Sequence, residues 1–234
     1  TYYTFYNDGN INFLERLNSW YQKGWVTTQT LYGSYTSGLF TTIDASKEKS
    51  YMSIGSSAGA THQRPAEVGG KYPFNVGIAT IPQADQNNRK VISQGPSICM
   101  LNTGSETKLM ATWLFIKYLT TSVEFQTEFS MASGYMPVLE NVADEELAKT
   151  NKAVAKYVDF IKNANGGDNI AALSAKVAIE QADAYYVSPA FVGSSTARDQ
   201  VGYLMQAAMS GYKSYVESGK SIDELITMVS SKGG

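Results

Sequence analysis

The chain has 234 residues, enough to bury one good hydrophobic core or two small ones, and its 43% apolar and 17% charged residues are ordinary for a globular protein. A net charge of −2, without a conspicuous cluster of Lys and Arg, argues against nucleic acid as a partner. No apolar run approaches the roughly 18 residues of a membrane span, and the first residues lack the charged-then-apolar pattern of a signal peptide.

The spacing of apolar residues predicts a first helix over residues 10–23, ended by a left-handed cap at Gly24. The apolar residues recur about one helical turn apart, at Ile11, Leu14, Leu17 and Tyr21. A polar stretch rich in Ser, Thr and Gly then leads to residues 51–59, where a short strand is expected to run into a turn of small residues. Such a turn can present backbone N–H groups and hydroxyls to a ligand.

Two more strands are expected in the middle of the chain. Residues 74–81 are predicted to form a buried strand that Pro82 stops, followed by a polar connection over residues 83–90. After a tight turn at residues 94–97, the apolar run 98–101 predicts another strand. It contains Cys99, the single cysteine, which we expect to be buried as a small hydrophobe.

Helices are predicted over most of the remaining chain. A helix over 106–119 has a broad apolar face, and Thr121 with Glu124 has the spacing of a capping box for the next one. Two long helices are expected over 144–163 and 196–217. The first ends at a Gly166–Gly167 break, and a capping box at Ser221–Glu224 opens a last helix. Strands separated by helices imply an α/β layer architecture.

Enzyme, metal and nucleotide chemistry have little support in the sequence. His62 is the only histidine and lies in a polar loop, which favours a surface histidine over a catalytic one. One His and one Cys do not fit zinc spacing, and the Asp and Glu residues do not form a calcium loop. Neither Gly-Gly pair is followed by Gly-Lys-Ser/Thr, so no phosphate loop is predicted.

Polar-ligand binding has better support. Aromatic residues are abundant, with 16 Tyr, 9 Phe and 3 Trp, and tyrosine offers both a flat apolar face and a hydroxyl. Ser56 and Ser57 on one turn, and Gly95 and Ser97 on another, can supply donors to a sugar or a phosphate. Arg198 is predicted in the first turn of a helix, where its guanidinium and the helix N-terminus could address the same anion.

Several segments, in this order, resemble elements of the extracellular solute-binding proteins of ABC importers, family 1, of the maltodextrin and glycerol-3-phosphate-binding type. They are residues 51–59 (YMSIGSSAG), 92–97 (ISQGPS), 133–138 (SGYMPV) and 221–229 (SIDELITMV). In the second segment Gln94 and Pro96 replace a Gly and an Ala of the family, which adds an amide at the turn. Arg198 falls where those proteins place a phosphate-binding arginine.

The resemblance implies an α/β fold of the periplasmic-binding-protein type II class. In that fold residues 1–90 and 139–234 would build the second lobe, and residues 91–138 would cross back to the first lobe. The N-terminal lobe and the signal peptide of such proteins are missing from this sequence. We therefore expect the chain to be the C-terminal part of a larger protein.

The resemblance also implies hinged capture of a carbohydrate or glycerol-phosphate-like solute and its delivery to an ABC permease, without catalysis, cofactor or metal. The expected ligand contacts are Ser56, Ser57, Gln94, Gly95 and Ser97, with stacking by Tyr135 or Phe191 and anion selection by Arg198. The full-length protein would be a monomer, periplasmic or held outside the cell as a lipoprotein. A carbohydrate-active hydrolase and a protein-interaction module remain the alternatives.

Overall fold

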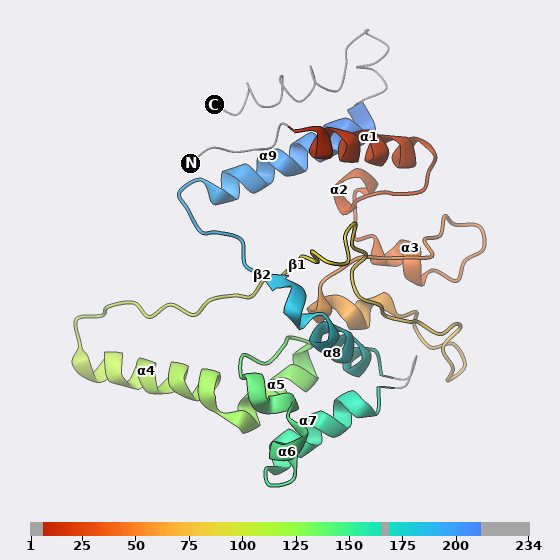
Figure 1. Ribbon diagram of the computed structural model, residues 1–234. Helices are drawn as coiled ribbons and strands as arrows, with labels where there is room; N and C mark the ends of the chain where they lie inside the picture. Colours follow the sequence, from red (N-terminus) through yellow and green to blue (C-terminus); the bar gives the residue numbers. More distant parts are fainter. Residues whose placement is uncertain (1–6, 165–168, 212–234) are drawn as a thin grey trace. The chain divides into compact units, whose positions relative to one another are not determined.

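A computed structural model describes residues 7–164 and 169–211 of the chain (Figure 1). The chain divides into two compact units. The described part of the first unit covers residues 7–36 and 189–211, and that of the second covers residues 37–164 and 169–188. These boundaries differ from the lobe boundaries expected after residues 90 and 138, so the assignment of segments to lobes stays a prediction.

The first unit is helical. The predicted first helix is confirmed as α1 (Asp8–Gln22). Asn7 caps its N-terminus, because the Asn7 side chain accepts a hydrogen bond from the Asn10 N–H. The chain leaves α1 through Gly24, whose φ of 71° is the left-handed conformation expected there. The unit continues with α2 (Gln29–Tyr32), α9 (Ser194–Gln206) and a π-helical turn, η4 (Ala207–Gly211).

The core of the first unit lies between α1 and the end of α9. Leu14 of α1 is buried against Ala208 of η4, and side chains of both helices surround the pair: Ile11, Leu204 and Met205. Beside this cluster the buried Asn18 donates from Nδ2 to the Ala208 carbonyl oxygen at 2.6 Å and to the Met209 carbonyl oxygen at 3.4 Å. A side chain of α1 thus satisfies backbone acceptors of the π-helical turn.

The second unit contains α3 (Ser37–Thr41), the 3-10 helix η1 (Ser57–Gln63), α4 (Glu106–Thr121), α5 (Val123–Ser133), η2 (Glu140–Ala143), α6 (Glu145–Ala148), α7 (Lys152–Lys162), α8 (Ile170–Glu180) and η3 (Ala182–Ala184). Its named strands, β1 (Val91–Ile92) and β2 (Tyr185–Tyr186), form a parallel pair, with Val91 opposite Tyr185 (Figure 1). The described part of this unit is therefore mostly helical.

Local hydrogen bonds support the strand pair. The Ser93 N–H donates to the Tyr186 carbonyl oxygen at 2.8 Å, which continues the ladder by one residue. Just before β1, Arg89 forms an ion pair with Asp183 of η3. The polar connection 83–90 is confirmed: its two ends are joined because the Lys90 N–H donates to Gln83 Oε1 at 2.9 Å.

The three predicted strands are wrong. Residues 51–54, 74–81 and 98–101 have no strand assignment, and the last residues of the expected small-residue turn, 57–59, begin the 3-10 helix η1. A strand needs a neighbour for its backbone N–H and C=O groups, and in the described residues these segments have no ladder partner. Cys99, in the last of these segments, is exposed rather than buried.

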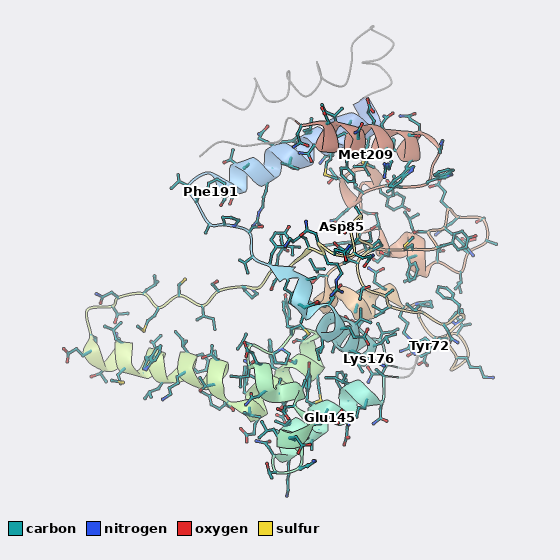
Figure 2. All side chains as sticks on the ribbon, in the orientation of Figure 1. Tyr72, Asp85, Glu145, Lys176, Phe191 and Met209 are labelled. Atoms are coloured by element: carbon teal, nitrogen blue, oxygen red, sulfur yellow. The ribbon has the colours of Figure 1, made fainter. Side chains whose placement is uncertain are left out.

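The helices correspond better to the predictions. The helix at 106–119 is confirmed as α4, but none of its residues is buried, and Trp113 is 52% exposed. Figure 2 shows its side chains projecting into open space around the helix axis. The next helix, α5, is capped by Ser122 instead of Thr121, since Ser122 Oγ accepts from the Phe125 N–H at 3.2 Å.

The expected helix over residues 144–163 is two helices, α6 and α7. Asn151 separates them because its Oδ1 accepts from the Ala153 N–H at 2.9 Å and from the Val154 N–H at 3.2 Å, which starts a new helix. Helix α8 was not predicted from the sequence. The Gly166–Gly167 break, the predicted helix beyond residue 211 and the capping box at 221–224 lie outside the described residues.

Helix α7 is central to the second unit, where it packs against α5, α6, α8 and η2 and buries Val154, Tyr157 and Val158. Tyr157 is 1% exposed and its ring stacks on Phe160 with 6.1 Å between centroids. Its hydroxyl is buried and has no hydrogen-bond partner among the described residues. Burial disfavours the phenolate and raises the pKa of Tyr157 to about 12.

None of the described helices has both the length and the apolar character needed to cross a membrane.

Replacing Asn18 by Ala should lower the free energy of unfolding by about 1–3 kcal/mol, because the Ala208 carbonyl oxygen of η4 loses its Asn18 donor, whereas the Met209 carbonyl oxygen keeps Gln22 Nε2 at 3.3 Å. Asn12, an exposed asparagine on the same helix, supplies the control variant Asn12→Ala, which should cost less than about 0.5 kcal/mol. Urea denaturation followed by circular dichroism measures both. Equal losses would show that the Asn18 bonds carry no stability.

Replacing Tyr157 by Phe should not destabilise the protein, because it removes a buried hydroxyl that has no partner. The matched control is Tyr185→Phe, since the Tyr185 hydroxyl donates to the Ala178 carbonyl oxygen at 2.7 Å. Losing that bond should cost about 1 kcal/mol. Thermal melts at pH 7 should therefore show a lower melting temperature for Tyr185→Phe but not for Tyr157→Phe, and a lower melting temperature for Tyr157→Phe would contradict the expectation.

Tyr157 should also make stability depend on alkaline pH. An unfolded tyrosine ionises near pH 10, whereas the folded Tyr157 stays neutral up to a pKa of about 12. The contribution of neutral Tyr157 to the free energy of unfolding is complete below pH 10. It is lost as the pH rises from 10 to 12, by at most about 1.4 kcal/mol per pH unit. Urea titrations of the wild type and of Tyr157→Phe should diverge over this range. Parallel curves would be inconsistent with the raised pKa.

Candidate functional site

The predicted serine turn lies at the start of η1. Ser56 is the N-cap residue with extended backbone, φ −69° and ψ 144°, and its side chain makes no capping hydrogen bond. The turn closes through the Gly59 N–H, which donates to the Ser56 carbonyl oxygen at 3.0 Å. Ser56 is exposed and Ser57 is half-buried. The hydroxyl of Ser56 is thus on the surface and is not used to cap the helix.

The Gly-Tyr-x-Pro element follows α5 directly. Gly134 ends the helix in the left-handed conformation, φ 75°, with its N–H donating to the Ser130 carbonyl oxygen at 3.0 Å. A methyl group added at Gly134 would lie 3.2 Å from the Ser57 carbonyl oxygen and 3.4 Å from the Ala58 Cα. The structure therefore brings the serine turn and the Gly134–Tyr135 element into direct backbone contact. Tyr135, next to this contact, is 43% exposed.

The second predicted turn follows β1. Gln94, Gly95 and Ser97 are all exposed and lie in a segment without regular secondary structure. Its entry is fixed by the pairing of Val91 and Ile92 with β2. No hydrogen bond in the described part of the chain joins this turn to Ser57 or Tyr135. The structure thus presents the turn on the surface, and its membership of the same site stays a prediction.

Phe191 and Arg198 belong to the first unit, whereas the other predicted ligand residues belong to the second. Phe191 is exposed, and its carbonyl oxygen accepts from the Ser194 N–H at 3.0 Å, just before α9. Because α9 begins at Ser194 and not at Thr196, Arg198 is its fifth residue and lies past the first turn. This corrects the expected placement, since the influence of a helix N-terminus falls off within that turn.

A further polar residue, Gln126, supports the Tyr135 element and was not predicted. Its side chain is buried in α5, donates from Nε2 to the Leu119 carbonyl oxygen at 2.5 Å and accepts at Oε1 from the Val138 N–H at 2.8 Å. Its partners are backbone groups outside α5, seven and twelve positions away along the chain. Sequence periodicity gives no signal for such a role, and a glutamine on a helix otherwise indicates an exposed position.

The second unit also has a surface pocket of about 460 Å³ at the end of η1 and the start of α8, and none of the predicted ligand residues lines it. Its walls include Arg64, whose guanidinium carbon lies 3.2 Å from the centroid of the Tyr72 ring (Figure 2 labels Tyr72). Among the described residues, no three His, Cys, Asp or Glu side chains are placed to hold a metal ion. The contact between Ser57 and Gly134 is therefore the best-defined feature of the candidate site.

Replacing Gly134 by Ala should destabilise the protein more than Gly104→Ala. Both glycines have positive φ, 75° and 70°, but a methyl group at Gly104 would meet nothing within 4 Å. The left-handed conformation alone should cost about 1–2 kcal/mol at either position, and the clash with Ser57 should add about 1 kcal/mol or more at Gly134. Urea denaturation gives both values. Equal costs would mean that the two backbones are not in close contact.

Comparison with known protein families gives a match. The family model described as bacterial extracellular solute-binding protein matches residues 7–156, more than half of the 234-residue chain. The match includes the turns at Ser57 and Gly95 and the Tyr135 element, whereas Phe191 and Arg198 lie beyond it. No curated protein and no solved structure matches the chain significantly.

The mostly helical structure, with its parallel strand pair, is compatible with the α/β fold of such binding proteins. Members of the family are not enzymes. They bind a small molecule in the periplasm or outside the cell and deliver it to the permease of an ABC importer. The chain belongs to the family of bacterial extracellular solute-binding proteins and has a solute-binding role in ABC import.

Proposed function

We propose that the chain captures a carbohydrate or a glycerol-phosphate-like solute at a site centred on the Ser57 turn and Tyr135. One observation carries the proposal: the backbone contact at Gly134, which places an exposed aromatic residue beside a turn of small polar residues. An aromatic face stacks on the apolar face of a sugar ring. Serine hydroxyls and turn N–H groups supply the donors that hydroxyl and phosphate oxygens need.

The remaining ligand contacts are part of the same proposal and rest on the family resemblance. Gln94, Gly95 and Ser97 are exposed and available on their turn. Phe191 would stack on a sugar, and Arg198 would select a phosphate or carboxylate by a charge-assisted pair of hydrogen bonds. The lobe assignment, the lipoprotein anchor of the full-length protein and the monomeric state also belong to this proposal.

A thermal-shift screen of the full chain tests the solute class. The panel consists of maltodextrins, other oligosaccharides, sn-glycerol 3-phosphate and glycerophosphodiesters. A bound solute should stabilise the protein by about 2.7 kcal/mol at 100 times its dissociation constant. A response to sugars alone would indicate that aromatic stacking is the main contribution to binding. A response to phosphates alone would indicate that Arg198 is the main contribution. No response across the panel would contradict the proposed solute class.

Two variants locate the site. Ser57→Trp should abolish the shift for every solute that binds, because the indole would fill the surface beside Tyr135. Ser34→Trp, at an exposed bend of the first unit, is its control and should leave the shift intact. Arg198→Ala should abolish the shift only for anionic solutes, whereas Arg16→Ala, at an exposed arginine of α1, should change neither class. Full binding by Ser57→Trp would remove the site from the Ser57 turn, and full binding of anionic solutes by Arg198→Ala would remove Arg198 from the proposal.

A further inference from the structure

The segment from Gly134 to Val138, which carries Tyr135, is fixed at both ends by α5. At its start the Gly134 N–H donates to the Ser130 carbonyl oxygen at 3.0 Å, and the backbone of Gly134 packs on Ser57. At its end the Val138 N–H donates to Gln126 Oε1 at 2.8 Å. The exposed Tyr135 ring thus projects from a short arch whose two ends rest on one helix.

Gln126 also bonds to helix α4. Its side chain is 7% exposed, and its Nε2 donates to the carbonyl oxygen of Leu119 in the last full turn of α4, at 2.5 Å. One buried amide therefore connects the end of α4 with the end of the arch. Because both its donor and its acceptor are satisfied away from water, the amide specifies one arrangement of the two segments.

From this geometry we infer that Gln126 is a positioning residue for the solute site: it holds the 134–138 arch, and with it Tyr135, in the arrangement that meets the Ser57 turn. The inference deepens the proposed function and rests on it. Gln126 itself is buried and touches no ligand. Its effect on binding is preorganisation, because a ring that is already fixed loses less conformational freedom when a solute stacks on it.

The chemistry of the two bonds requires a primary amide. A carboxylate could accept from the Val138 N–H but could not donate to the Leu119 carbonyl oxygen. Methionine has nearly the same length and shape but has no donor, and its thioether sulfur is only a weak acceptor. The variant Gln126→Met therefore removes both bonds while it keeps the space filled.

The neighbouring Thr127 provides a matched control. It is fully buried in the same helix, but its hydroxyl donates only to carbonyl oxygens of α5, those of Val123 at 2.9 Å and Glu124 at 3.0 Å. Thr127→Val keeps the shape and removes a hydroxyl bond without affecting the arch. Any general loss of stability in α5 should appear in both variants, whereas loss of positioning should appear only in Gln126→Met.

The first measurement needs no solute. Amide hydrogen exchange of the full chain, resolved at Val138 by NMR, should be at least about fivefold faster in Gln126→Met than in the wild type. In Thr127→Val it should stay within about twofold. Unchanged exchange at Val138 in Gln126→Met, or equal acceleration in both variants, would overturn the inference. If the methionine variant does not fold, Gln126→Asn, which keeps the amide but shortens its reach, serves in its place.

The second measurement uses maltotriose and sn-glycerol 3-phosphate as probes. For whichever probe binds the wild type, Gln126→Met should raise the dissociation constant at least about fivefold, and Thr127→Val should leave the dissociation constant unchanged. Equal affinities in all three proteins would overturn the positioning role. If neither these probes nor any other solute of the panel shifts the melting temperature of the wild type, the proposed solute class fails, and the exchange measurement still decides whether Gln126 holds the arch.

Discussion

The candidate site depends on one constraint, the close approach of two backbones at Gly134. The residue at this position has to end α5 in a left-handed conformation and has to leave room for the Ser57 carbonyl oxygen at the same time. Only glycine satisfies both conditions without strain. A single residue without a side chain therefore determines where α5 stops and how near the serine turn comes to Tyr135.

The elements on either side of this contact are held by the packing of the second unit. Helix α5 lies against α7, and the side chains of its buried residues Gln126 and Thr127 bond to backbone groups. On the other side, η1 packs against α8, with Ala60 and Ile170 in one apolar cluster. The site is thus formed at the surface, but its geometry is set by two helix contacts beneath it.

Local signals in the sequence predicted helices better than strands. The ends of α1 and α4 followed from apolar spacing and from residues such as Gly24, because caps and periodicity act over a few positions. The three strands were wrong because a strand forms only when a distant segment supplies its hydrogen bonds. Helix prediction also has a limit at Asn151, because its capping side chain divides into two helices an apolar pattern that predicts one continuous helix.

The same distinction holds for the candidate site. The residue types at Ser57 and Tyr135 were recognisable from their motifs, but their contact is a tertiary feature. Arg198 was misplaced by two positions within α9 because the helix begins after Gly193, a cap without a side chain, and not at Thr196. The role of Gln126 could not be predicted from the sequence, because its side chain bonds to one backbone carbonyl oxygen and one backbone N–H that come within reach only in the folded chain.

The parallel pairing of β1 and β2 has a consequence for how the second unit assembles. The ion pair beside it joins Arg89 to Asp183, 94 positions apart, and the ladder itself joins equally distant parts of the chain. Closing so long a loop has a large entropic cost, and a ladder of two residues per strand offsets little of it. The intervening helices should therefore dock first and bring the strands together. The turn at Gln94 and Gly95 would then reach its final place among the last events of folding.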